Sequence, residues 1–279
     1  MEDPPDYDSP MVALALGRRG AGKSVMLEGL AENYLYAGAN VLDLYGSGDA
    51  ENLAWLRSPW VAEEGYSALL IRGVNVDVDA PWPSKSWKDI SLKDLEENRI
   101  VISPRPLYES KDEEYQASAR IIDLLFSRVG WQKYICTIAR ESASLFYSRI
   151  KLRQSQLGSK AEGIYILREA RHFGIALLLD TQKLTSVDVD IRSLADYLIM
   201  KAQGVDNLPR EFWFLYGFFK PQWFRYMRPE EFALVTKKGA IGLGKNTMPV
   251  WHKRPRENIL RALGISVTVN QRQDVPFEK

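Results

Sequence analysis

The chain has 279 residues and a formal net charge of +1, with 37 Lys and Arg against 36 Asp and Glu. This balance excludes a uniformly basic protein, so any site for a polyanion has to be a local patch. Hydrophobic residues make up 46% and charged residues 26% of the chain, which is typical of a globular protein with a full core. The single cysteine, Cys136, excludes an internal disulfide and favours a reducing compartment.

Short apolar runs alternate with helical stretches from residue 11 onward. The first ten residues are acidic and proline-rich, and they predict a mobile N-terminal arm. Predicted strands cover 11–16, 40–45, 69–73, 99–104, 134–139 and 175–180, and predicted helices cover 24–38, 110–130 and 160–174. Continuous apolar strands that alternate with helices predict an α/β domain, in which helices cover both faces of a parallel sheet.

The last third of the chain has a different pattern. "FALVTKKGAIGLG" predicts a β-hairpin, and "RENILRALGI" predicts a short helix near the C-terminus. The simplest division is a core at 11–205 with an insertion at 46–98, followed by a C-terminal segment at 206–279 that packs on the core.

The stretch "GRRGAGKS" follows the first predicted strand directly. Its spacing G-x-x-x-x-G-K-[ST] is that of a phosphate-binding loop, in which backbone N–H groups and a helix N-terminus hold the phosphates. We expect Lys23 to reach the β- and γ-phosphates of ATP, and Ser24 to bind Mg²⁺. The predicted cradle comprises Gly17, Arg18, Arg19, Gly20, Ala21, Gly22, Lys23, Ser24 and Val25.

An acidic pair is expected at the end of a later strand, where the sequence instead has Arg140 followed by Glu141. Glu141 is the candidate that polarises the attacking water. Because Arg140 occupies the position of the magnesium-orienting aspartate, Asp43 or Asp180 at neighbouring strand ends is expected to replace it. We take Asp43 with Ser24 as the metal ligands. Arg140 itself either contacts a phosphate, or pairs with Glu141 and weakens it as a base, or forms only a surface pair with it.

A polar amide follows the strand at 175–180. Gln182 lies where such a side chain can touch the γ-phosphate and report hydrolysis, so it is the candidate sensor.

Four stretches, in this order, resemble the HerA/FtsK superfamily of DNA-pumping ATPases: "GRRGAGKS", "NVLDLYGSGD", "ICTIARESASLF" and "REARHFGIALLLDTQKLTSVDVDIRSLADYLI". The C-terminal "EFALVTKKGAIGLGKNTMPVWHKRP" is similar to the hairpin and tail that follow the motor core in this superfamily. The resemblance implies a RecA-like P-loop NTPase of the additional-strand, catalytic-glutamate type. No apolar run is long enough to span a bilayer, which favours a soluble HerA-like or viral DNA-packaging-type motor over a membrane-anchored one.

The resemblance also implies ATP-driven movement of double-stranded DNA by a ring, usually a hexamer, with ATP at the subunit interfaces. An arginine from the neighbouring subunit would neutralise charge in the transition state. Arg192 is the first candidate, ahead of Arg171 and Arg168. The expected location is the cytoplasm, or the host cytoplasm or virion for a viral protein, and a nuclease or capsid protein is a candidate partner.

A basic stretch follows the candidate glutamate. It contains Arg149, Lys151, Arg153 and Lys160. Several copies in a ring would line a channel with positive charge for the DNA backbone, whereas the alternative is an ordinary solvated helix face.

Two further functions stay open from the sequence. One is a nucleotide-dependent assembly scaffold or switch with weak turnover because of Arg140. The other is a small-molecule P-loop kinase, which the tryptophan- and acid-containing stretch at 46–98 disfavours because it does not resemble an arginine-rich lid.

Overall fold

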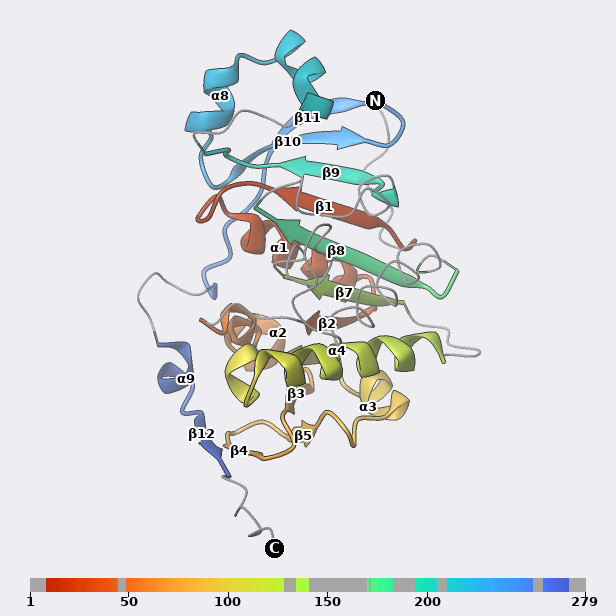
Figure 1. Cartoon of the computed structure of the whole chain (residues 1–279), viewed down its shortest axis with the longest axis vertical. Helices are drawn as coiled ribbons and strands as arrows, with labels where there is room; N and C mark the ends of the chain where they lie inside the picture. The colour runs from red at the N-terminus through yellow and green to blue at the C-terminus, as the bar shows by residue number, and fades with distance from the viewer. Residues whose placement is uncertain are drawn as a thin grey trace, which may run out of the picture.

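The computed structural model describes residues 9–44, 49–127, 134–140, 170, 172–182, 194–204, 210–252 and 258–270 (Figure 1). The elements of its N-terminal half are β1 (Val12–Leu16), α1 (Lys23–Tyr36), β2 (Asn40–Leu44), η1 (Glu51–Arg57), α2 (Pro59–Ala62), β3 (Ala68–Arg72), β4 (Val76–Asp79), β5 (Ser84–Ser86), α3 (Leu92–Glu97), β6 (Ile100–Ser103), η2 (Arg105–Leu107) and α4 (Lys111–Phe126). Those of its C-terminal half are β7 (Ile135–Ala139), β8 (Ile175–Thr181), β9 (Tyr197–Met200), η4 (Arg210–Gly217), α8 (Pro221–Tyr226), β10 (Glu231–Thr236), β11 (Ile241–Lys245), α9 (Ile259–Ala262) and β12 (Ser266–Val269).

One sheet of ten strands runs through the described part of the molecule in the order β11-β10-β9-β1-β8-β7-β2-β6-β3-β5. Every pairing from β9 to β5 is parallel. The predicted hairpin, β10 and β11, continues the sheet through an antiparallel pairing with β9. The α/β fold with a mostly parallel central sheet is therefore confirmed.

Helices cover both faces of this sheet, with α4 on one face and α1 on the other (Figure 1). Alternate side chains of the fully buried β1 point to opposite faces, as strand geometry requires. Leu14 belongs to the same buried cluster as Ile121 of α4, whereas Ala13 and Ala15 belong to the cluster that contains Leu27 of α1. The small alanines leave room for α1 to lie close to the sheet.

The six strands predicted in the core, the helices at 24–38 and 110–130 and the C-terminal hairpin all correspond to observed elements. The predicted helix at 160–174 lies mostly outside the described residues. Within the stretch 46–98, β3 and β5 join one edge of the main sheet. The sequence did not predict β12, which pairs with β4 in a second, two-stranded sheet beside α9 (Figure 1).

Across the described ranges, no helix is both long enough and apolar enough to cross a membrane.

Candidate nucleotide-binding site

The loop at residues 17–24 joins the central strand β1 to α1. Gly22 has a φ of 81°, a left-handed conformation that glycine adopts without the steric cost of a side chain. The N–H of Gly17 donates to the last carbonyl of β8 at 3.2 Å, and the N–H of Arg18 donates to the carbonyl of Ala202, just after β9, at 2.8 Å. The strands on both sides of β1 therefore hold the loop in place.

Two glycines of the loop lie too close to other chain segments to carry a side chain. A Cβ added at Gly17 would lie 2.8 Å from Cβ of Lys201, and one added at Gly22 would lie 2.4 Å from the carbonyl oxygen of Pro229. The loop is thus packed against the end of β9 and against the chain that follows α8. Close approach therefore requires glycine at both positions, and at Gly22 the left-handed backbone conformation requires it as well.

The first turn of α1 has no side chain that caps it and no acidic residue. Its N–H groups are left for an anion, which the positive end of the helix dipole attracts. The Lys23 side chain is folded back over the loop, where Nζ donates to the carbonyl of Arg18 at 3.2 Å. Its Nζ also lies 4.0 Å from Oδ2 of Asp180. This arrangement fits a site for phosphate groups.

Ser24, the next residue, contacts an acidic side chain that the sequence did not single out. Its hydroxyl donates to Oε2 of Glu51, the first residue of η1, at 3.1 Å. The expected metal ligand Ser24 therefore lies beside a carboxylate, and this carboxylate is neither Asp43 nor Asp180.

The Arg140 side chain turns into the protein interior, because it is bound on two sides by buried acids. Its Nε and Nη2 donate to Oδ1 and Oδ2 of Asp43 at 2.9 and 2.6 Å, and Nη2 also donates to Oε1 of Glu28 at 2.5 Å. The side chains of both acids are fully buried, and that of Arg140 is 2% exposed. One interpretation of the sequence expected Arg140 to contact a phosphate. In the structure its side chain instead forms a buried charge network with Asp43 and Glu28.

Asp43 is committed to this network. In addition to Arg140, Oδ2 accepts from Nε1 of Trp55 at 2.8 Å. A role for Asp43 in holding the metal, as predicted, would require these bonds to break. The geometry instead favours a structural role for this carboxylate.

The electrostatics of the pair follow from its burial. Burial raises the pKa of the Asp43 carboxyl, and Arg140 opposes this rise. Burial alone would lower the pKa of Arg140, but Asp43 and then Glu28 outweigh it and raise that pKa well above its ordinary value. The guanidinium therefore stays charged, and it compensates the two carboxyl groups in a place that water does not reach.

The C-terminal segment completes the surroundings of this network. Nδ1 of His252 faces Oε2 of Glu28. The neighbouring Trp251 packs against Trp55, with ring centroids 5.0 Å apart, and its Nε1 donates to Glu32 of α1 at 3.2 Å. The segment after β11 is thereby tied to the helix that begins at the phosphate-binding loop.

A second buried cation lies on the other side of the loop. Nζ of Lys201 donates to the carbonyl of Pro229 at 2.7 Å and to Oδ1 of Asn246 at 2.5 Å. Burial lowers the pKa of Lys201 to about 8, which Glu230 partly opposes. Because the same Pro229 carbonyl faces Gly22, Lys201 fixes the segment that packs against the loop.

The sheet order places the remaining sequence candidates. β8 separates β1, which leads into the loop, from β7, which ends just before Arg140. Gln182 directly follows β8 and is exposed beside the loop. Other candidates lie outside the described residues, namely Glu141, Arg192, Arg168, Arg171, Arg149, Lys151, Arg153 and Lys160.

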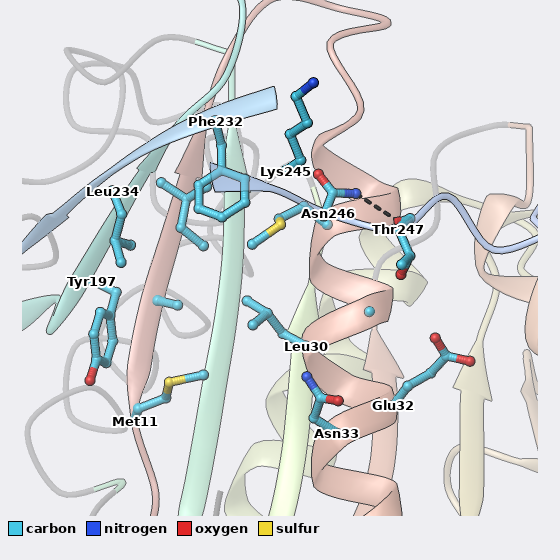
Figure 2. A pocket seen from close by; sticks show the side chains of 14 residues that line it. Met11, Leu30, Glu32, Asn33, Tyr197, Phe232, Leu234, Lys245, Asn246 and Thr247 are labelled. Carbon is cyan, nitrogen blue, oxygen red and sulfur yellow. Dashed lines mark hydrogen bonds between the residues drawn. The ribbon is translucent and has the colours of Figure 1, made fainter. Parts of the chain in front are cut away.

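A cavity of about 430 Å³ lies between α1 and the face of β1, β9 and β10 (Figure 2). Met11, Leu30, Tyr197 and Phe232 give it a mainly apolar lining. No residue from 17–24 lines it, so the nucleotide is not assigned to this cavity.

A glycine-rich loop between a buried parallel strand and an uncapped helix defines the P-loop NTPase fold. The additional strand β8, between the loop strand and the strand that leads to the acidic motif, places it among the additional-strand members of that fold.

Among solved structures, the chain is similar to the bacterial conjugative coupling protein TrwBdeltaN70, with 10% identity, a TM-score of 0.60 and coverage of 90% of this chain and 88% of that chain. It also matches the genome packaging NTPase B204 from Sulfolobus turreted icosahedral virus 2, with 14% identity, a TM-score of 0.48 and coverage of 85% and 97%. The similarity to TrwBdeltaN70 shows a shared fold, and it agrees with the P-loop NTPase fold that the loop and the strand order define. No protein-family model matches the sequence, and no curated protein matches it.

Sequence reasoning missed Glu28, Glu51 and Lys201. The two glutamates of α1, Glu28 and Glu32, give no sign in the sequence that Glu28 is fully buried, and Lys201 belongs to no motif. For Glu51, the only available signal was an acidic residue soon after the strand that carries Asp43.

Proposed function

We propose that the protein is an ATP-driven translocase of double-stranded DNA that works as a ring and hydrolyses ATP at its subunit interfaces. The observation that carries this proposal is the loop at 17–24, which is anchored to the strands on both sides of β1 and leads into a helix with no side-chain cap. The chain shares its fold with a bacterial conjugative coupling protein, and the sequence resemblance to DNA-pumping ATPases suggests DNA as the cargo. The proposal also includes residues outside the described ranges, namely Glu141 and Arg192.

The described residues have distinct roles in this proposal. Backbone N–H groups of the loop and the first turn of α1 bind the phosphates, and Lys23 contacts the transferred group. The hydroxyl of Ser24 contributes to holding Mg²⁺, which supplies charge neutralisation at the phosphates when it is bound. Gln182 senses the γ-phosphate from the end of β8. Glu141 orients the attacking water, and Arg192 acts on the neighbouring subunit.

Self-association is supported by an aromatic surface at η4 and α8, where the chain protrudes at one end of the molecule (Figure 1). The exposed side chains of this surface include Trp213, Phe214, Phe218 and Tyr226. Aromatic residues and arginines without acids are typical of protein–protein interfaces, and the sequence from 213 to 229 contains no Asp or Glu. We assign this aromatic surface to contacts between copies of the chain.

DNA contacts are assigned to Arg149, Lys151, Arg153 and Lys160. In a ring of near-neutral chains, symmetry would gather these side chains around one channel. Binding would then depend on salt and not on sequence, because phosphate contacts carry no sequence information.

A DNA-stimulated ATPase assay, with a mass measurement on the same sample with and without ATP, tests the proposal. Lys23→Ala is expected to abolish turnover, whereas Lys238→Ala, which removes an exposed lysine in the β10–β11 turn, is the matched control. ATP hydrolysis by a stable monomer, at a rate that DNA does not change, would refute the translocase proposal. Tight ATP binding with negligible turnover in the wild type would favour the assembly switch instead.

A further inference from the structure

The most informative contact outside the predicted motif is the one between Ser24 and Glu51. Ser24 is the only loop residue whose hydroxyl can bind a metal in a P-loop. In the described part of the chain, this hydroxyl donates to Oε2 of Glu51 at 3.1 Å. Adjacent oxygen ligands of an octahedral Mg²⁺ are about 2.9 Å apart, given metal–oxygen distances of about 2.0–2.1 Å. The two oxygens are therefore already spaced as two ligands of one magnesium.

The other carboxylates near the loop are engaged elsewhere. Asp43 and Glu28 are fully buried and bound to Arg140. Asp180 lies 4.0 Å from the Lys23 ammonium, and Asp49 lies 3.7 Å from the Arg19 guanidinium. The Glu51 side chain is 32% exposed, so it alone among these five combines contact with Ser24 and access from solvent.

Arg140 supplies an independent observation that points to the same carboxylate. Its Nη1 is buried and has no hydrogen-bond partner among the described residues, and it lies 3.9 Å from Oε2 of Glu51. Buried polar atoms of this kind are rare and call for an explanation. Here the N–H at Nη1 faces Glu51, which accepts no hydrogen bond from Arg140, unlike Asp43 and Glu28. A small movement of the guanidinium would let Nη1 donate to Glu51.

The backbone just before Glu51 is also unusual. Ala50 has a φ of 56° and is the one non-glycine residue in the described ranges with a positive φ. The left-handed conformation is sterically unfavourable for a residue with a side chain. Ala50 adopts this conformation directly before η1, which begins with Glu51 beside the loop.

We propose that Glu51 replaces, from η1, the magnesium-orienting carboxylate that the strand end lacks at Arg140. Glu51 and Ser24 together hold the Mg²⁺ that accompanies ATP, while the buried guanidinium of Arg140 positions the Glu51 carboxylate by charge attraction. Magnesium is usually bound by one or two carboxylates plus substrate phosphates, which agrees with the lack of any group of three or more acidic, His or Cys metal ligands in the described part of the chain. The inference rests on the proposed ATP-binding function of the loop.

Binding of a fluorescent ATP analogue, titrated with Mg²⁺ and again with EDTA, tests the proposal without reference to turnover. In the wild type, Mg²⁺ is expected to tighten binding. In Glu51→Gln, which removes the charge and keeps the size, we expect Mg²⁺ to tighten binding at least tenfold less, while the affinity in EDTA stays within about twofold of wild type. Glu64→Gln makes the same change at an exposed position of the chain and is expected to behave as wild type.

The outcomes separate the two proposals. Wild-type protein that binds no ATP analogue would refute the nucleotide function itself. Wild-type binding in EDTA together with an unchanged response of Glu51→Gln to Mg²⁺ would overturn the role of Glu51 alone. Electron paramagnetic resonance of bound Mn²⁺ with the analogue gives a second readout, in which loss of bound Mn²⁺ is expected for Glu51→Gln, and a wild-type spectrum would contradict the proposal.

Discussion

Replacing Arg140 by methionine is expected to destabilise the protein by about 3–5 kcal/mol at pH 7, because removal of one partner leaves buried charges without compensation. Arg140 is 2% exposed, and the two acids that it binds are fully buried. Methionine replaces most of the side-chain volume, so the loss reports the charge and not a large cavity. Urea denaturation monitored by circular dichroism measures the free energy of unfolding.

The pH dependence of this loss identifies its cause. Burial raises the pKa of Asp43 and Arg140 opposes the rise, so the folded-state pKa of Asp43 climbs further in Arg140→Met. A carboxyl whose folded-state pKa is raised stabilises the folded state when it is protonated. The variant should therefore recover stability as the pH falls through this raised value toward the ordinary value of 3.8. Measurements at pH 7 and pH 5 compare the two conditions.

Arg120→Met is the control, since Arg120 is an exposed arginine of α4, and its replacement is expected to change stability by less than about 0.5 kcal/mol. A loss below about 1 kcal/mol in Arg140→Met at pH 7, or a loss that grows toward pH 5, would refute the buried network. Arg140→Asp should be the worse variant because it adds a third acid. It is not expected to restore a magnesium site.

Three further predictions follow from local geometry. Gly22→Ala should abolish binding of an ATP analogue, because its Cβ would lie 2.4 Å from the Pro229 carbonyl, whereas Gly29→Ala, inside α1 with no atom within 4 Å, should stabilise the fold by about 0.5–1 kcal/mol in urea. The pKa of Lys201 is lowered to about 8 from 10.5, so between these values the unfolded state binds more protons than the folded state. The free energy of unfolding of the wild type should therefore rise by about 1–2 kcal/mol from pH 8 to 9.5 relative to Lys201→Met. Parallel pH profiles of the two proteins would contradict this. Trp251→Ala should cost about 3–5 kcal/mol, and a thermal melt equal to wild type would disprove its packing role.

The parts of the fold that were predicted correctly are those specified by short stretches of sequence. The glycine spacing at 17–24, the apolar runs of the central strands and the hairpin at 231–245 each carry their own pattern. The two-stranded sheet of β4 and β12 has no such pattern, because its strands have four residues each and lie far apart in the sequence.

The site was predicted only in part for the same reason. The loop is one contiguous motif, but Arg140 meets Asp43 and Glu28 across 97 and 112 residues of sequence. The sequence left three interpretations of Arg140 open, namely contact with a phosphate, a pair with Glu141 that weakens it as a base, and a surface pair with Glu141. The side chain instead turns inward, because two buried acids on β2 and α1 supply the charge that makes burial of a guanidinium tolerable. Nothing in the local sequence around Arg140 specifies those partners.

The surroundings of Gly22 connect the aromatic surface to the phosphate-binding loop. Pro229, which faces Gly22, lies three residues after the end of α8 at Tyr226. The carbonyl of Phe224 in α8 accepts a backbone hydrogen bond from Gln203 at 2.8 Å. A second copy that docks on α8 would therefore shift or fix a segment that touches the loop.

Thermodynamic linkage then requires the converse effect, in which nucleotide at the loop changes the affinity between copies by the same factor. We expect an ATP analogue to shift the association constant between copies, measured by analytical ultracentrifugation. Trp213→Ala is expected to weaken this association. At concentrations where the wild type assembles, the variant should therefore also bind the nucleotide more weakly. Trp213 is 51% exposed, so this variant should unfold as wild type does. Weaker association with nucleotide affinity unchanged at those concentrations would show that α8 transmits nothing to Gly22, and would leave the aromatic surface as an interface independent of the loop.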